Sequence, residues 1–438
     1  MTFESGGAVF NLLDTPGHED FSEDTYRTLT AADSAVMVID AAKGIEAQTL
    51  KLFEVCRLRD IPIITFINKL DREARDPFAL IDEISDRLQL ECAPMNWPAG
   101  SGLNFCGVHD LATGAFLPFG EKSLPEDARA KLEEDIALLS EASPRFDLAS
   151  YREGHMTPVY FGAALKNFGV RELLAAVSAY APSPRPAPAI PRNVDPSEDR
   201  VTGFVFKVQA NMDPNHRDRV AFFRLCSGRF VRPMKLRQSG TGKTISIHNP
   251  ILFFAKERET VDEAFPGDII GIPNHGTLRV GDTLTEGEAL TFTGIPNFAP
   301  EILRRVRLAD AMKAKHLKRA LESLAEEGVT QVFKPLVGAG WTVGVVGALQ
   351  LDVLKSRLQS EYGLDADLEA SPYEAARWLD GAPADIEKFR DAHKGQMAED
   401  RDGAPVFLAK NAWELGYVAG KFPKLKFLKT REVSHTAA

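Results

Sequence analysis

Cysteine is scarce in this sequence. Its 438 residues include four cysteines, which form no Cys-x-x-Cys pair and no framework of close spacings: Cys56, Cys92, Cys106 and Cys226. This pattern excludes a small secreted domain held by disulfides and predicts a reduced, cytoplasmic protein. Cys92, Cys106 and His109 could be grouped as metal ligands, but their spacing is loose, so we interpret them as structural residues.

Long apolar runs are also missing. The longest stretches, such as Ile61–Ile67, are far shorter than the ~20 residues that span a bilayer. The first residues show no basic region followed by an apolar one, so we expect no secretory signal and no membrane association. With 44% hydrophobic and 26% charged residues, the composition is that of a soluble protein long enough for two to four domains.

Charge is distributed unevenly along the chain. The formal net charge is −10, yet residues 201–260 hold 11 Lys and Arg against 4 Asp and Glu, a balance of +7. A basic middle on an acidic chain indicates a surface that faces a polyanion. The alternative is a solvated β-domain that is basic by chance.

The first part of the chain alternates apolar strands with helical stretches, the pattern of a doubly wound α/β sheet. The predicted strands are Ala8–Leu13, Ala35–Ile39, Ile61–Ile67 and Pro158–Phe161. The predicted helices are Thr25–Ala31, Ala47–Arg59, Pro77–Leu88 and Val170–Tyr180. Residues 90–155 have less regular signals and are predicted to be an insertion on this domain, which spans 1–181.

Two further domains follow a proline-rich linker at 182–198. Short β-type segments predict a small β-barrel over 199–295: Thr202–Gln209, Val220–Cys226, Thr244–His248 and Ile269–Ile272. Over 296–438 the pattern predicts an α+β domain with the ferredoxin-like order β-α-β-β-α-β, followed by a basic tail at Lys421–Arg431. The fold class is therefore multidomain: an incomplete α/β domain, a small β-barrel and an α+β C-terminal domain.

Two strand ends carry polar motifs typical of guanine-nucleotide sites. The first runs into Asp14-Thr15-Pro16-Gly17-His18, where an aspartate can hold Mg²⁺ and a glycine lets a backbone N–H approach a γ-phosphate. The second runs into Asn68-Lys69-Leu70-Asp71. There the Asp71 carboxylate can accept hydrogen bonds from guanine N1–H and N2–H₂, Lys69 can lie over the base, and Asn68 can brace neighbouring loops. The two motifs together predict a GTPase.

The phosphate-binding loop Gly-x-x-x-x-Gly-Lys-Ser/Thr does not precede these motifs, so we expect the domain to lack it. Ser239–Thr244 ends in Gly-Lys-Thr, as a phosphate-binding loop does. The motif needs a glycine five positions before Gly242, and Arg237 stands there. We predict instead that this segment connects two strands of a hairpin.

The sequence resembles bacterial peptide chain release factor three, a translational GTPase. The resemblance covers essentially the whole chain. It is carried by the segments Asp14–Thr30, Val38–Gly44, Asn68–Arg72, Cys92–Pro98, Pro158–Gly162 and Phe265–Asp268. Members of that family carry the phosphate loop and the first switch ahead of the matching point. We therefore expect this chain to be an N-terminally truncated member.

The resemblance implies a GTP-dependent translation termination factor that binds the ribosome as a monomer and promotes release and recycling of class I peptide chain release factors. It implies GTP or GDP and Mg²⁺ as cofactors, with Asp14 as the metal ligand and His18 orienting the hydrolytic water. It extends the nucleotide site to Ala163-Ala164-Leu165, where the family usually has Ser or Thr in place of Ala163. An alternative is a ribosome-binding remnant that does not depend on nucleotide.

Overall fold

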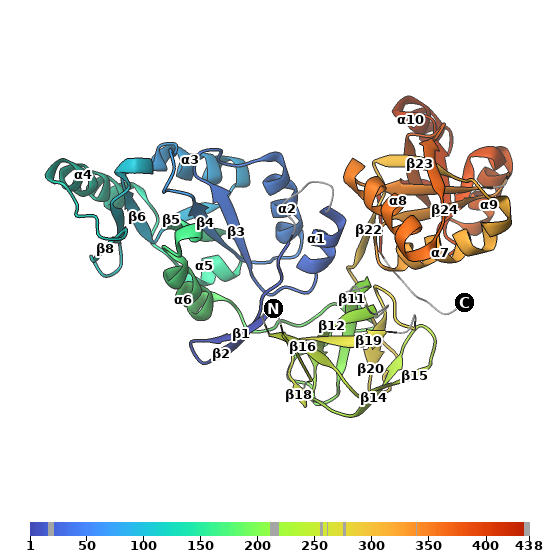
Figure 1. Cartoon of the computed structure of the whole chain (residues 1–438), viewed down its shortest axis with the longest axis horizontal. Helices are drawn as coiled ribbons and strands as arrows, with labels where there is room; N and C mark the ends of the chain where they lie inside the picture. Colours follow the sequence, from blue (N-terminus) through green and yellow to red (C-terminus); the bar gives the residue numbers. More distant parts are fainter. Residues whose placement is uncertain are drawn as a thin grey trace. The chain divides into compact units, whose positions relative to one another are not determined.

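The structure of the chain is a computed structural model. It describes residues 1–15, 22–210, 219–254, 257–260, 262–274, 277–338 and 340–432. The chain divides into two compact units: one of residues 1–13 and 31–185, and one of residues 14–30 and 186–438. Both units are drawn in Figure 1.

The first unit is an α/β domain around a short parallel sheet. Its strands are β1 (Thr2–Ser5), β2 (Ala8–Asn11), β3 (Ala35–Asp40), β4 (Ile63–Asn68), β5 (Glu91–Pro94), β6 (Asn96–Ala99), β7 (Gly107–Asp110), β8 (Phe116–Pro118) and β9 (Met156–Phe161). Its helices are α2 (Ala47–Leu58), α3 (Pro77–Leu88), α4 (Glu126–Ala142), α5 (Leu148–Arg152) and α6 (Val170–Tyr180).

The parallel sheet has the order β3–β4–β9–β5. Its central strand β4 is an apolar run that is buried along its length up to Asn68, as expected for a parallel strand covered on both faces. Ile64 and Phe66 of β4 pack with Tyr151, Tyr160 and Ala176 in one core cluster. Because the strands are parallel, their carboxyl ends meet at one edge, where Asp40 of β3 is in register with Asn68 of β4.

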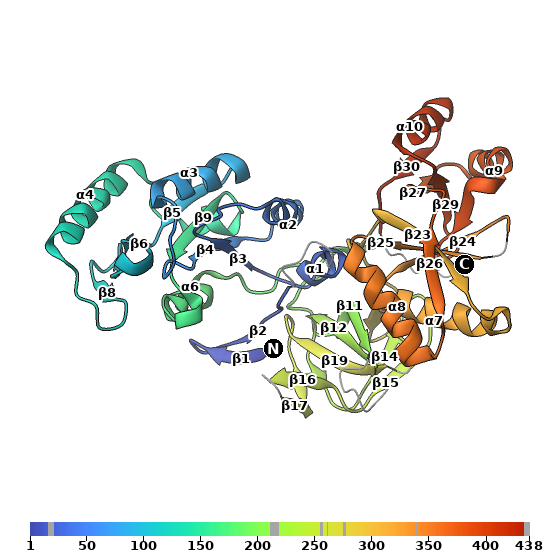
Figure 2. The same cartoon turned by 45° about the horizontal axis from the view of Figure 1, so that its top comes forward.

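The segment predicted as an insertion begins inside the sheet. Its first strand, β5, pairs with β9, so residues 91–94 belong to the core of the domain. The rest forms a separate antiparallel sheet of order β6–β7–β8. Helix α4 is tied to this sheet by Trp97 Nε1, which donates a hydrogen bond of 3.2 Å to Asp135 Oδ2. Figure 2 shows the insertion beside α3.

The strand predicted at Ala8–Leu13 is not a strand of this parallel sheet, and that prediction was wrong. Within the first unit, β2 pairs with β1 as an antiparallel hairpin. The reason is local: Gly6 and Gly7 form a two-residue turn, with φ of 58° and 78°. Two positive φ angles are what a tight hairpin turn requires, and two consecutive glycines adopt them readily.

The second unit combines one N-terminal helix, α1 (Ser22–Leu29), with the whole C-terminal part of the chain. Its first sheet is antiparallel, with the order β15–β14–β20–β11–β12–β19–β16, and β17 pairs with β16. These strands are β11 (Thr202–Ala210), β12 (Arg219–Ser227), β14 (Met234–Gln238), β15 (Thr244–Ile247), β16 (Ile251–Phe254), β17 (Glu257–Thr260), β19 (Ile269–Asn274) and β20 (Thr283–Thr285). Three short pairs accompany it: β10 (Ala189–Ile190) with β21 (Thr291–Phe292), β13 (Phe230–Val231) with β18 (Glu263–Ala264), and β22 (Pro296–Phe298) with β31 (Thr430–Glu432).

Part of the predicted linker is therefore ordered within this unit. The boundary between the two units falls between Arg185 and Pro186. Beyond it, Arg192 forms ion pairs with Glu198 at 2.7 Å and with Glu288 at 2.9 Å.

The C-terminal sheet has eight strands in the order β26–β23–β25–β24–β28–β29–β27–β30. Its first half has the chain order β23 (Ile302–Leu308), α7 (Ala314–Glu326), β24 (Gln331–Pro335), β25 (Trp341–Val345), α8 (Ala348–Tyr362) and β26 (Ala366–Ala370). Helices α7 and α8 close one core, which includes Leu321, Leu324 and Leu354.

The same element order then occurs a second time, which the sequence prediction missed. It runs β27 (Ala375–Asp380), α9 (Pro383–Ala392), β28 (Met397–Glu399), β29 (Pro405–Ala409), α10 (Ala412–Lys421) and β30 (Lys426–Leu428), around a core centred on Phe389. The predicted basic tail at Lys421–Arg431 is therefore the end of α10, β30 and part of β31. Strands of three residues, such as β28 and β30, are too short to show an alternating pattern.

Candidate functional site

Asn68 lies at the carboxyl end of β4 and joins two loops. Its side-chain Oδ1 accepts hydrogen bonds from the backbone N–H of Lys69 and from that of Ala164, each at 2.8 Å. The first loop is the predicted guanine motif, and the second follows β9 and holds the other predicted base contact. One side chain thus brings residues 68–71 and 163–165 together.

Lys69 is held by the neighbouring strand. Its backbone is left-handed, with φ of 73°, and its Nζ lies 2.7 Å from Asp40 Oδ2. Asp40 Oδ1 also accepts a hydrogen bond of 2.9 Å from the N–H of Ala42. Burial by itself raises the pKa of Asp40, but the hydrogen bonds from Lys69 and Ala42 outweigh it, so the pKa lies below the ordinary value. The ion pair fixes the Lys69 side chain over this edge of the sheet.

Leu70 and Asp71 have opposite environments. The Leu70 side chain is buried, its N–H donates to the Gly162 carbonyl at 3.2 Å, and its own carbonyl accepts from Gly102 N at 2.8 Å. The Asp71 side chain is half-buried. Within the described part of the chain it has no hydrogen-bond or ion-pair partner, so both carboxylate oxygens can accept hydrogen bonds from a ligand.

The loop after β9 is tightly constrained. Ala163 is fully buried, and its N–H donates to the Phe168 carbonyl at 3.0 Å, while Leu165 is 79% exposed. A Cβ at Gly162 would lie 2.6 Å from the Phe66 ring, so only glycine fits there. Ala164–Lys166 forms a 3₁₀ turn. The backbone of this loop, rather than its side chains, therefore faces the Asn68 loop.

Several residues that shape this edge were not singled out as site residues by the sequence. Asp40 forms an ion pair with Lys69. The sequence pattern that could have identified it is a carboxylate directly after the apolar run Ala35–Ile39. Glu83 accepts hydrogen bonds from Arg75 and Arg87, and Arg87 also donates to the Ile45 carbonyl at 2.8 Å, which secures the loop after β3. Asn96 receives the N–H of Phe161 at 2.7 Å and donates to its carbonyl at 3.1 Å. These contacts join residues that are distant in sequence, so no local sequence pattern predicts them.

The structure describes only the first two residues of the predicted motif Asp14–His18. Asp14, with an exposed side chain, and Thr15 belong to the second unit. Pro16, Gly17 and His18 lie outside the described residues. The helix that follows, α1, packs within the second unit, where its Tyr26 ring lies 4.5 Å from that of Phe298.

A guanine base fits the residues of the first unit, because a half-buried carboxylate without a partner matches its N–H donors. Around Asp14 the fit to a metal is limited to one exposed carboxylate. Among the described residues, no three His, Cys, Asp or Glu side chains gather into a metal site. One or two carboxylates suffice for Mg²⁺ only where phosphate oxygens complete its coordination.

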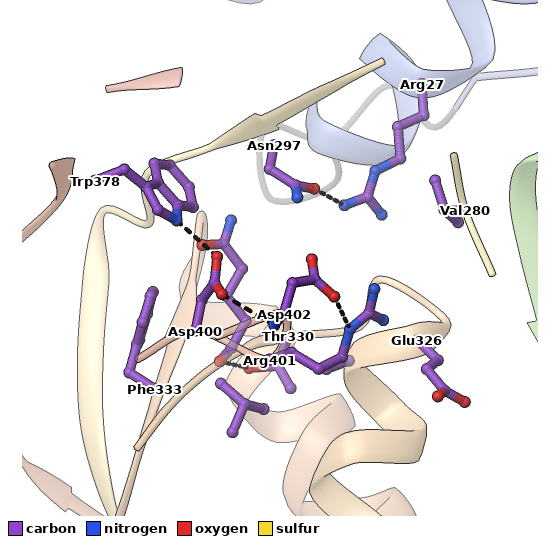
Figure 3. Close-up of a pocket in the computed structure, with 13 residues that line it drawn as sticks. Arg27, Val280, Asn297, Glu326, Thr330, Phe333, Trp378, Asp400, Arg401 and Asp402 are labelled. Atoms are coloured by element: carbon purple, nitrogen blue, oxygen red, sulfur yellow. Dashed lines mark hydrogen bonds and ion pairs between the residues drawn. The ribbon is translucent and has the colours of Figure 1, made fainter. Parts of the chain in front are cut away.

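Two cavities lie elsewhere. One, of about 50 Å³, is in the second unit beside Arg27, Trp378 and Asp400 (Figure 3). It is too small for a nucleotide, since ligand pockets measure about 300–1,000 Å³. The other, of about 200 Å³, lies at the amino ends of β4, β5 and β9, between Ile63, Leu90 and Met156. It is at the opposite edge of the sheet from Asn68.

The structure also tests the prediction made for Ser239–Thr244. Ser239–Lys243 connects β14 and β15, which pair antiparallel, so the Gly-Lys-Thr segment is a hairpin connection as predicted. Cys92 is buried, which raises the pKa of its thiol to about 12, and the same holds for Cys56. As for membranes, none of the described helices is both long enough and apolar enough to cross one.

Three family models match successive segments of the chain. Residues 1–183 match the elongation factor Tu GTP-binding domain, and residues 200–287 match elongation factor G domain 2. Residues 292–419 match the C-terminal domain of class II release factor RF3.

The fold is also similar to that of a solved crystal structure of a protein from Thermus thermophilus. The two are 21% identical, with a TM-score of 0.69 over 87% of this chain. The chain spans 62% of the length of that protein. The three family matches occur in this order along one chain and end in the RF3 domain. Together they support an RF3-like translational GTPase.

Proposed function

We propose that this protein is a GTP-dependent translation termination factor, which binds the ribosome and promotes release and recycling of class I release factors. The observation that carries the proposal is the arrangement at the edge of the parallel sheet. Asn68 clamps the loop of residues 69–71 to the loop after β9, and the Asp71 carboxylate has no partner among the described residues. The match to the RF3 C-terminal domain supports a role in termination.

Asp71 would select the base. A guanine offers N1–H and N2–H₂ to a single carboxylate, whereas adenine has no amino group at that position. A polar site built for such donors rejects a ligand that lacks them, because the carboxylate would be desolvated without a partner. Lys69, anchored by Asp40, would cover the face of the base. The N–H groups of Ala163 and Ala164 are bonded to Phe168 and Asn68, so the N–H of Leu165 would meet the O6 edge of the base.

Hydrolysis would depend on the first motif. Asp14 would hold Mg²⁺, which stabilises charge on the phosphates when bound, and His18 would orient the attacking water. Thr15, Pro16 and Gly17 would place the backbone near the γ-phosphate. Positioning and charge stabilisation, rather than covalent catalysis, are what phosphoryl transfer requires of a protein.

The remaining domains would serve binding to the ribosome. We interpret the antiparallel sheet of β11–β20 as the elongation-factor β-barrel, and the C-terminal unit as ferredoxin-like in its element order. The barrel carries the basic excess at residues 201–260. Contacts of Lys and Arg with RNA phosphates would give a salt-dependent affinity for the ribosome. We expect the protein to act as a monomer in the cytoplasm.

Calorimetry of the chain with GTP, GDP and ATP tests the proposal. We expect GDP and GTP to bind and ATP not to bind. The matched control is Lys243→Ala, in the hairpin connection that imitates a phosphate loop, and it should leave the affinity unchanged. Equal affinity for ATP and GTP would contradict the assigned role of Asp71. Saturable ribosome binding that is indifferent to GTP would instead favour a nucleotide-independent factor.

A further inference from the structure

Helix α10 carries a row of stacked side chains on its exposed face. Trp413, Tyr417 and Lys421 are spaced four residues apart, so they lie one above the other. The Trp413 and Tyr417 rings are 5.3 Å apart and nearly parallel, at 7°. Lys421 Nζ lies 4.3 Å from the centre of the Tyr417 ring. We call these three residues the α10 ladder.

The ladder has no role in the core of its own domain. Other side chains of α10 serve that core: Val418 belongs to the cluster of Phe389 and Phe407, and Leu415 packs against it. Trp413 is 74% exposed and Tyr417 is 51% exposed. Two adjoining aromatic rings left in water mark an interaction surface, because their burial would otherwise stabilise the fold.

Two glycines beside the ladder support the same conclusion. Gly416 and Gly420 lie inside α10, where glycine is less stable than alanine. An added Cβ at either position would meet no atom within 4 Å, so packing does not require glycine there. Because glycine has no side chain, the backbone beside the rings is uncovered at these two positions. A planar group can therefore approach the helix closely there.

The charge around the ladder is positive. Residues 410–432 hold six Lys and Arg against two Glu, a balance of +4. Two of these cations, Lys426 and Arg431, form ion pairs with Asp380 and Asp400. Lys424 and Lys429 have no carboxylate partner among the described residues. The acidic residue of α10, Glu414, accepts hydrogen bonds from Gln396 Nε2 at 3.0 Å and from the N–H of Lys410 at 2.6 Å. Its carboxylate is therefore engaged within the fold.

We propose that the α10 ladder binds unpaired bases of RNA. A base would stack on the open face of Trp413, and Lys421 and Lys424 would contact the flanking phosphates. Aromatic platforms flanked by cations are how proteins hold single-stranded RNA, whereas an apolar protein partner would leave these cations without counter-charges. The inference rests on the proposed function only for the source of the RNA, which would be an unpaired loop of ribosomal RNA.

Fluorescence titration of the full chain tests the ladder directly. Trp413 is the exposed tryptophan, since Trp97 and Trp378 are buried and Trp341 is half-buried. The probes are a 12-nucleotide RNA without self-complementarity and the blunt duplex of the same sequence. We expect the single strand to quench the fluorescence and bind more tightly than the duplex. Trp413→Ala should weaken single-strand binding by about 5- to 100-fold, followed with labelled RNA.

Three further variants separate binding from folding. Trp413→Phe keeps an aromatic face and should retain most of the affinity, and Met312→Ala, at a position 93% exposed, should change nothing. Gly416→Ala with Gly420→Ala should raise the melting temperature and yet weaken RNA binding. A merely structural role of this helix would not produce that combination. Lys424→Gln should make the negative slope of log affinity against log salt shallower by about 0.7.

Equal binding of the two RNAs, or unchanged affinity in Trp413→Ala, would overturn the inference. If Trp413→Ala lost binding to a ribosomal protein but kept binding to RNA, the inference would be overturned in favour of a protein partner. The nucleotide test is independent, because ladder variants should keep the parent's affinity for GDP. A chain that binds RNA through the ladder but no guanine nucleotide would contradict the proposed function alone.

Discussion

Arg27 of α1 donates a hydrogen bond of 3.0 Å from Nη2 to Oδ1 of Asn297 in β22, 270 residues further along the chain (Figure 3). Beside this contact the Tyr26 ring packs on Phe298. Arg27 is buried, at 7% exposure. The helix that follows the first nucleotide motif is therefore anchored in the second unit by a charge-assisted hydrogen bond and an aromatic contact.

Removing the amide of Asn297 should loosen this anchor. We expect Asn297→Ala to lower the free energy of unfolding of the second unit by about 1.5–3 kcal/mol, because the hydrogen bond involves a buried charged group. Urea unfolding, compared with the exposed control Asn193→Ala, measures the effect. If the two variants were equally stable, the contact would contribute nothing to the position of α1.

Asp71→Asn should change which base is bound. A carboxamide donates where the carboxylate accepted, so it repels the guanine N2–H₂ and matches the carbonyl that xanthine has at that position. We expect GDP affinity to fall by at least tenfold and xanthosine diphosphate to bind instead, as measured by calorimetry. The control is Asp60→Asn, at the other end of β4. If the variant lost affinity for both GDP and xanthosine diphosphate, the result would indicate local unfolding rather than altered recognition.

The ion pair of Asp40 and Lys69 should be visible in a carboxyl titration. The pKa of Asp40 lies below its ordinary value of 3.8 in the folded protein. Its contribution to stability is therefore fully present above about pH 4 and is lost as the pH falls through the folded value. Lys69→Met removes the ammonium group and should raise the pKa of Asp40 toward or above 3.8. An NMR titration that found no change would show that the ion pair is absent in solution.

The fold could be predicted from the sequence where a local pattern determined the element. Helices α3 and α6 begin and end at the predicted residues, since Asp76 caps α3 just before Pro77 and the apolar periodicity of α6 starts directly after Gly169. β2 was placed in the wrong sheet because its strand pattern is the same in a hairpin. The glycine turn before it decides the pairing.

The candidate site was predictable only as a motif. Asn68 and Asp71 were identified because their residue types at a strand end match the donors of guanine. Their supports, Asp40 and the N–H of Ala164, come from other strands, and only the parallel register of β3, β4 and β9 brings them together. The second β-α-β-β-α-β half was missed because its partners in the sheet are far apart in sequence, as with Trp378 and Leu428.

Breaking the buried ion pair of Arg357 and Glu327 should be more costly than any change above. Arg357 Nη2 lies 2.7 Å from Glu327 Oε2, and the Glu327 side chain is 2% exposed. Burial raises the pKa of Glu327, and the nearby Arg357 and Arg219 only partly offset this. Arg357→Gln leaves the carboxylate buried with less compensation and should lower the free energy of unfolding by about 3–5 kcal/mol.

The loss should also depend on pH in a defined direction. A folded pKa above the unfolded value means that stability is lost as the pH rises through the folded pKa. Arg357→Gln raises that pKa further, so the variant should be more destabilised at about pH 8 than at about pH 5. Adding Glu327→Gln removes the charge and should restore much of the stability and flatten the pH dependence. Thermal unfolding of the variants at both pH values measures these stabilities, with the exposed Lys318→Gln as control. A pH-independent loss would mean that Arg357 acts through packing alone.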